Sequence, residues 1–186
     1  GGSYNQYDYF RIMQQEVPGI FNQIDGISSH SYPNPGFSAH PNIQTSKSIT
    51  SFIHELELIE DLSNKKLPIF ITETGWTQEE FSDRVIGDYF KTALEDVWNH
   101  PQIVAVTPFL LKAGPGPFEK FSLLRDNGDE NEIFKSLKSV IKTKGKPLPA
   151  IAKKMLGDNE ISQNLPVRNF SGEKTNKQEK MLKTFV

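Results

Sequence analysis

The 186-residue sequence contains no cysteine, no long hydrophobic run and no excess of charge. Without cysteine there are no disulfide bonds, no thiol catalysis and no thiolate metal sites. No apolar run approaches the roughly 20 residues of a membrane-spanning helix. The formal net charge of −2 argues against a general binder of nucleic acid or membrane surfaces. The 36% of hydrophobic residues are enough for the core of one domain.

Glycine-rich phosphate-binding motifs are also missing. The sequence contains neither G-x-G-x-x-G nor G-x-x-x-x-G-K-[ST], so nucleotide binding has little support. Three of the four histidines, His40, His54 and His100, show no metal-ligand spacing. We therefore predict neither a metal nor a cofactor.

What the sequence does contain is a regular alternation of helical and strand patterns. The spacing of apolar residues predicts helices over residues 5–16, 49–62, 81–97 and 133–141. Short apolar segments predict strands over residues 24–32, 67–71 and 103–111. Strands that alternate with helices are typical of an α/β fold with a parallel sheet. The last two strands are almost continuously apolar, which predicts that both of their faces are covered.

Two local patterns refine this organisation. Thr77 and Glu80 stand at the spacing of a capping box, which predicts the start of the third helix. From Gly157 onward the sequence is polar and lysine-rich, which predicts a linker or the start of a following domain. We therefore expect one α/β unit over residues 1–156, with a short helix at 149–156, and a separate tail over 157–186.

Polar and aromatic residues gather where the predicted strands end. The candidate site residues are His30 and Tyr32 after the first strand, Glu73 and Trp76 after the second, and Phe109 after the third. In parallel α/β folds the loops at the carboxyl ends of the strands converge on the active site. We therefore expect these five side chains at one edge of the sheet.

These residues resemble a known family. Residues 71–76, with the sequence I-T-E-T-G-W, look like strand seven of clan GH-A, the retaining glycoside hydrolases with (β/α)8 barrels. Residues 30–32 resemble the H-x-Y at the end of strand six in that clan. Residues 8–13 are similar to the helix before strand six, and residues 121–128 to the segment after strand eight. The resemblance covers residues 4–142 and implies the C-terminal portion of a TIM barrel.

The resemblance also implies a chemistry. A glutamate at the end of strand seven is the clan's nucleophile, so Glu73 would attack the sugar of a β-linked glycan or glycoside. His30 or Tyr32 would hydrogen-bond the Glu73 carboxylate or a sugar hydroxyl, and Trp76 would stack on a sugar ring. The clan usually has a tryptophan near the end of strand eight, where this sequence has Phe109. In such a double displacement the two carboxyl groups stand about 5–5.5 Å apart.

The second carboxylate of the clan does not come from residues 4–142, the part of this chain that resembles it. A barrel of eight strands needs about 250 residues, and the start Gly1-Gly2-Ser3 is unlike a natural one. We therefore expect the N-terminal barrel half, with the general acid/base glutamate, in a longer polypeptide or a second chain. The pairs Asn131-Glu132 and Asn159-Glu160 follow no apolar strand and are not candidates for that role. Activity on polysaccharides would favour a protein that is exported or held at the cell surface.

Two other interpretations stay open. A catalytically inactive barrel could hold a glycan as a carbohydrate-binding module, and Phe109 in place of tryptophan keeps that alternative alive. The chain could also be an α/β domain of another class, such as a small flavodoxin-like regulator with the 67–71 strand at its centre. A carboxylate about 5–5.5 Å from Glu73 would favour the retaining enzyme.

Overall fold

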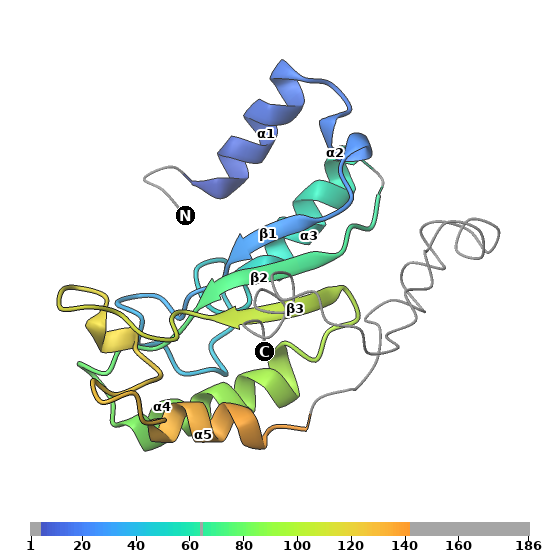
Figure 1. Ribbon diagram of the computed structural model, residues 1–186. Coiled ribbons are helices and arrows are strands. Elements are labelled where there is room, and N and C mark those ends of the chain that lie inside the picture. Colours follow the sequence, from blue (N-terminus) through green and yellow to red (C-terminus); the bar gives the residue numbers. More distant parts are fainter. Residues whose placement is uncertain (1–4, 64, 142–186) are drawn as a thin grey trace, which may run out of the picture. The chain divides into compact units, whose positions relative to one another are not determined.

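A computed structural model describes residues 5–63 and 65–141, which lie within one compact unit (Figure 1). Its centre is a parallel sheet in the order β1-β2-β3, formed by Ile27–His30, Ile69–Thr74 and Ile103–Pro108. The alternation of strands and helices that the sequence predicted is confirmed, and the chain is of the α/β class. The predicted helix at 149–156 and the predicted tail lie outside the described residues.

Helices connect and flank the strands (Figure 1). Their bounds are α1 Gln6–Glu16, α2 Ile20–Gln23, α3 Ser51–Ser63, α4 Asp83–Thr92, the π-helical turn η1 Ala93–Val97, the 3₁₀ turn η2 Glu119–Phe121 and α5 Glu132–Ser139. The side chains of Asn5, Ser82 and Asn131 cap α1, α4 and α5 by accepting a backbone N–H of the first turn. Among the described residues, no helix has the length and apolar character needed to span a membrane.

The helix after β2 begins later than the sequence predicted. The predicted capping box at Thr77 is wrong, because its Oγ1 accepts the N–H of Glu79 at 3.2 Å and closes a turn instead. The backbone N–H of Thr77 donates to the carbonyl of Phe37 at 3.1 Å. This contact ties the segment to the loop after β1, so the helix starts only after its true cap, Ser82.

The core lies on one side of the sheet. Its fully buried side chains come from α3, β2 and α4 and include Phe52, Ile59, Ile69, Ile71, Ile86 and Phe90. Each such side chain contributes about 1.5–3 kcal/mol by its removal from water. This packing fixes β2, and with it the end of the strand where Glu73 stands.

The opposite face of the sheet is open to solvent. Ser28, Phe70 and Ala105 are paired in register across the three strands, and all three are exposed. β2 therefore alternates between buried and exposed residues, and most of β3 is only half-buried. The prediction that both strands are covered on both faces is wrong, because the described helices pack against the side of Ile69 and Ile71.

The three strands point toward the same edge, where their connecting loops gather (Figure 1). The loops after β2 and β3 approach closely there, since a Cβ on Gly75 would lie 3.0 Å from the carbonyl oxygen of Phe109. The Asn34–Pro35 peptide bond in the loop after β1 and the Phe109–Leu110 peptide bond in the loop after β3 are cis. The carboxyl edge thus brings together the loops that hold the candidate site residues.

Candidate active site

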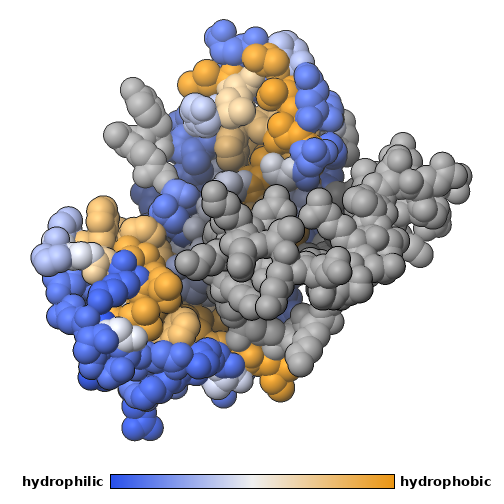
Figure 2. All heavy atoms as spheres, in the orientation of Figure 1, coloured by the Kyte–Doolittle hydropathy of each residue, from blue (hydrophilic) through white to orange (hydrophobic). Residues whose placement is uncertain are grey.

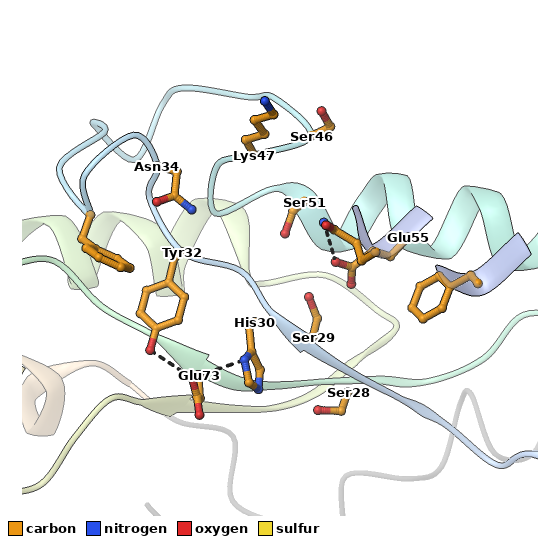
Figure 3. A pocket seen from close by; sticks show the side chains of 13 residues that line it. Ser28, Ser29, His30, Tyr32, Asn34, Ser46, Lys47, Ser51, Glu55 and Glu73 are labelled. Carbon is orange, nitrogen blue, oxygen red and sulfur yellow. Dashed lines mark hydrogen bonds and ion pairs between the residues drawn. The ribbon is translucent and has the colours of Figure 1, made fainter. Parts of the chain in front are cut away.

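Glu73 stands near the end of β2 and is held by two side chains of the neighbouring strand and its loop. The Tyr32 hydroxyl donates a hydrogen bond to Glu73 Oε2 at 3.2 Å. His30 Nδ1 lies 3.2 Å from the same oxygen (Figure 3). The structure therefore brings together the three polar residues that the sequence placed at the ends of two strands.

An irregularity in the ladder makes this meeting possible. Ser28 and Ser29 pair with Phe70 and Ile71, but His30 then pairs with Glu73 and skips one residue of β2. A regular ladder would place His30 opposite Thr72 and turn Glu73 toward the other face, because successive side chains alternate. The one-residue shift aligns the imidazole with the carboxylate.

Electrostatics fixes the direction of the Tyr32 hydrogen bond. Burial, and then the negative charge of Glu73, raise the pKa of the Tyr32 phenol well above its usual range. The phenol therefore stays protonated at neutral pH and donates to the carboxylate. The other oxygen, Glu73 Oε1, accepts no hydrogen bond from the residues that the structure describes.

A pocket of about 600 Å³ opens beside this group. Its walls come from β1, the end of β2, the loop after β1 and the helices α1 and α3, and most of its side chains are polar. Small-molecule sites span roughly 300–1,000 Å³. The side chains of Glu73 and His30 are each 36% exposed, so solutes can reach the carboxylate.

A second carboxylate, Glu55 of α3, lines the same pocket. The residue is only 4% exposed. Its Oε1 accepts a hydrogen bond from Gln6 Nε2 at 3.3 Å, whereas its Oε2 has no hydrogen-bond partner in the described part of the chain. Burial raises the pKa of Glu55, an effect larger than the opposing influence of the Ser29 and Gln6 side chains. Glu55 thus keeps its proton to higher pH than an exposed glutamate.

The sequence analysis did not identify Glu55 as part of the site. A signal was present, because Glu55 stands three residues after Phe52 and four before Ile59, on the apolar face of its helix. Figure 3 shows Glu55 near Ser29 on one side of β1, whereas Glu73 lies on the other side. The two carboxylates line one pocket from opposite sides of the same strand.

Trp76 does not belong to the pocket. The residue is 1% exposed, and its indole N–H donates to the carbonyl of Ala39 at 2.8 Å. Its ring packs against Tyr89 and Phe90 of α4, with centroid distances of 5.7 and 5.0 Å. The expectation that Trp76 stacks on a sugar is wrong, because the core encloses the indole.

Phe109 lies beside the site rather than in the pocket wall. Its ring centroid is 6.4 Å from that of Tyr32 and 5.8 Å from that of Phe121, both in edge-to-face geometry. Phe109 is half-buried, and it touches the residue that holds Glu73. The substrate contact predicted for Phe109 stays a prediction.

The described residues contain no group of three or more His, Asp or Glu side chains arranged to hold a metal ion. The groups that meet at the carboxyl end of β2 are a carboxylate, a phenol and an imidazole. The chain matches no protein-family model, and comparisons with curated proteins and with solved structures find no significant similarity. A function for this chain rests on the geometry of the site and on the resemblance of its motifs.

Proposed function

We propose that this chain is the C-terminal portion of a retaining glycoside hydrolase barrel that cleaves β-linked glycans or glycosides, with Glu73 as the nucleophile. The observation that carries the proposal is the Glu73 carboxylate at the carboxyl end of a parallel strand. Tyr32 and His30 hold one of its oxygens, and the other oxygen accepts no hydrogen bond from residues 5–63 and 65–141, beside a pocket of about 600 Å³. This arrangement suits a carboxylate that must attack in one direction.

The proposed reaction has two displacements. Glu73 Oε1 attacks the anomeric carbon, an ester forms between the sugar and the enzyme, and the bond to the leaving oxygen breaks. A protonated carboxyl group gives its proton to that oxygen. The same group then takes a proton from water, which attacks the anomeric carbon and releases Glu73. Tyr32 and His30 keep Oε2 in place throughout, so Oε1 meets the sugar at a fixed angle.

The open parts of the sheet support a larger barrel. Within the described residues, β1 and β3 each pair only with β2, so each has a free edge. Phe70 is exposed on the uncovered face. Free edges and exposed apolar faces are normally paired or covered in native proteins. We infer that the sheet continues beyond β1 into a part of the barrel supplied by a longer polypeptide or a second chain.

We assign the general acid/base to a glutamate of that other part, about 5–5.5 Å from Glu73. Glu55 has the raised pKa that a general acid needs, and burial is its cause. However, Glu55 lies on the other side of β1 from Glu73 (Figure 3), and its unpartnered oxygen is buried. Its position supports a role in packing rather than in proton transfer to a leaving group.

The test uses the complete protein that carries this chain and a dinitrophenyl β-glycoside, whose leaving group needs no proton. We expect Glu73→Ala to lower turnover by at least about a thousandfold, or about 4 kcal/mol. Added azide should restore turnover by attacking the anomeric carbon from the vacated side, which yields a glycosyl azide of inverted configuration. The matched control is Glu57→Ala, which removes an exposed carboxylate of α3 and should leave turnover unchanged.

Two results would decide against the proposal. Undiminished turnover of the Glu73→Ala variant would remove Glu73 from the nucleophile role. Binding of glycans by a wild-type protein that shows no turnover on any activated glycoside would favour the carbohydrate-binding module instead.

A further inference from the structure

The loop after β3 exposes large apolar side chains beside the candidate site. Phe118 is 57% exposed and Leu111 is 45% exposed. Figure 2 shows hydrophobic residues gathered over the loops at the end of the sheet toward which the strands point. Contiguous exposed apolar surface of this kind often marks a binding site.

The same loop forms a shallow hollow of about 290 Å³, bounded by residues 110 and 113–118. A Cβ placed on Gly114 or Gly116 would meet no atom within 4 Å, so the backbone of the loop is open on that side. The φ angle of Gly116 is +140°, a conformation that residues with side chains rarely adopt. The hollow is thus lined almost entirely by apolar atoms, with proline and phenylalanine rings among them.

A pyranose ring complements such a surface. Its C–H faces are apolar and lie flat on aromatic rings, while its hydroxyls stay in water on the open side of the hollow. A peptide ligand with a flat apolar side chain is the alternative occupant of this hollow. The sugar is favoured here because the hollow adjoins a site proposed to act on sugars.

Phe118 is connected with Glu73 through a short series of contacts. Its ring packs edge-to-face on Phe109 at 5.6 Å, and Phe109 packs on Tyr32 at 6.4 Å. The Tyr32 hydroxyl then donates to Glu73. Phe118 therefore lies at the same edge of the sheet as the carboxylate, but it does not line the pocket with it.

We infer that Phe118 is a stacking residue for a sugar ring that lies away from the cleaved bond. The site would then prefer oligosaccharides over glycosides of a single sugar. This inference rests on the proposed function and names the substrate class of the same site. Phe118 binds substrate in this scheme and takes no part in the chemical steps.

The experiment measures binding in the complete protein with Glu73→Gln, which prevents turnover. The probes are hexaoses of β-linked glucose, mannose and xylose, with the p-nitrophenyl β-glycoside of each sugar as the short ligand. We expect Phe118→Ala to weaken binding of the best hexaose about tenfold and to leave the short glycoside unaffected. Phe118→Tyr, which keeps the ring, should restore hexaose binding.

A matched control is available in Tyr9 of α1, which is also 57% exposed. Tyr9→Ala removes an equally exposed ring far from the loop after β3 and should leave the binding of all probes unchanged. Thermal unfolding of each variant checks that the fold is intact. In the active protein, Phe118→Ala should raise KM for the hexaose and leave kcat nearly unchanged.

Several outcomes would overturn the inference. Hexaose binding that is unchanged in Phe118→Ala, or weakened equally for the short glycoside, would exclude a distant stacking role. Loss of self-association without any change in binding would identify the loop as a contact between copies. Absence of binding by every probe would also contradict it. The proposed nucleophile is judged separately, since turnover by Glu73→Ala bears on the chemistry and not on hexaose binding.

Discussion

Glu73 and Glu55 line one pocket, yet their surroundings are opposite. The Glu73 side chain is about one-third exposed, and His30 of β1 and Tyr32 of the loop after β1 hold one of its oxygens. Glu55 is buried, and the Gln6 side chain donates a hydrogen bond to its Oε1. Burial raises the pKa of Glu55, so this carboxyl favours its neutral form. The same side chain type is thus accessible to solvent in one place and buried with a raised pKa in the other.

The strand between them explains the difference. Ser28 and His30 face the side of Glu73, and Ser29 faces the side of Glu55, because successive residues of β1 alternate (Figure 3). Neighbouring residues of β1 therefore face different surroundings. His30 faces the solvent-accessible Glu73, and Ser29 faces the buried Glu55 of α3. A place in the wall of the pocket therefore does not separate the two carboxylates, whereas their exposure and their hydrogen-bond donors do.

The largest expected effect separates the two carboxylates by activity. Glu73→Gln should lower kcat/KM on an aryl β-glycoside by at least about a thousandfold, because an amide cannot form the ester intermediate. Glu55→Gln should leave kcat/KM within about threefold of wild type, since the amide resembles the neutral carboxyl that burial favours. Comparable losses in the two variants would break the distinction and make Glu55 a candidate acid.

A smaller effect tests what holds Glu73. Tyr32→Phe removes the hydroxyl that donates to Oε2 and keeps the ring that packs on Phe109. A hydrogen bond to a charged group contributes about 1.5–3 kcal/mol, so kcat should fall roughly 10–100-fold. Phe37→Leu, which changes a neighbouring ring contact and leaves the hydrogen bond intact, is the control. Equal kinetics of Tyr32→Phe and wild type would show that the hydroxyl does not orient the nucleophile.

The smallest effect concerns stability and pH. The pKa of Glu55 is raised in the folded state, so the folded chain binds more protons than the unfolded chain above about pH 4.5. The contribution of Glu55 to stability is therefore fully present below that pH and is lost as pH rises through the folded pKa. Glu55→Gln should remove this loss. Its Tm should match wild type near pH 4 and exceed it at pH 8.

Glu57→Gln provides the comparison, because Glu57 is an exposed carboxylate on the same helix. Its Tm should follow the wild-type dependence on pH throughout. A wild-type protein whose Tm depends on pH in the same way as that of Glu55→Gln would show that Glu55 does not titrate as its burial requires.

The sequence predicted the part of the site that depends on strand ends. Periodicity identified the strands, and the carboxyl ends of parallel strands meet at one edge, so His30, Tyr32 and Glu73 were expected together. The burial of Trp76 could not be predicted in this way. It depends on a contact with the Ala39 carbonyl and on the packing of α4, which no local pattern encodes.

The covering of the sheet could not be predicted either. An apolar run has the same pattern whether a helix of this unit covers its second face or leaves that face open. The exposure of Phe70 therefore could not be predicted from the sequence. The late start of α4 has a similar cause, because the backbone of Thr77 bonds to a residue 40 positions earlier, Phe37. Local sequence determines the type of an element, and distant contacts determine where it begins and what covers it.

The ladder shift between Ser29 and His30 has a consequence for anyone who would transplant this constellation onto another scaffold. Grafting a histidine, a tyrosine and a glutamate onto two regular parallel strands would send the imidazole and the carboxylate to opposite faces. The graft must include the one-residue register shift between the two strands as well as the side chains. The portable unit is therefore a piece of irregular backbone, and the three functional groups come with it.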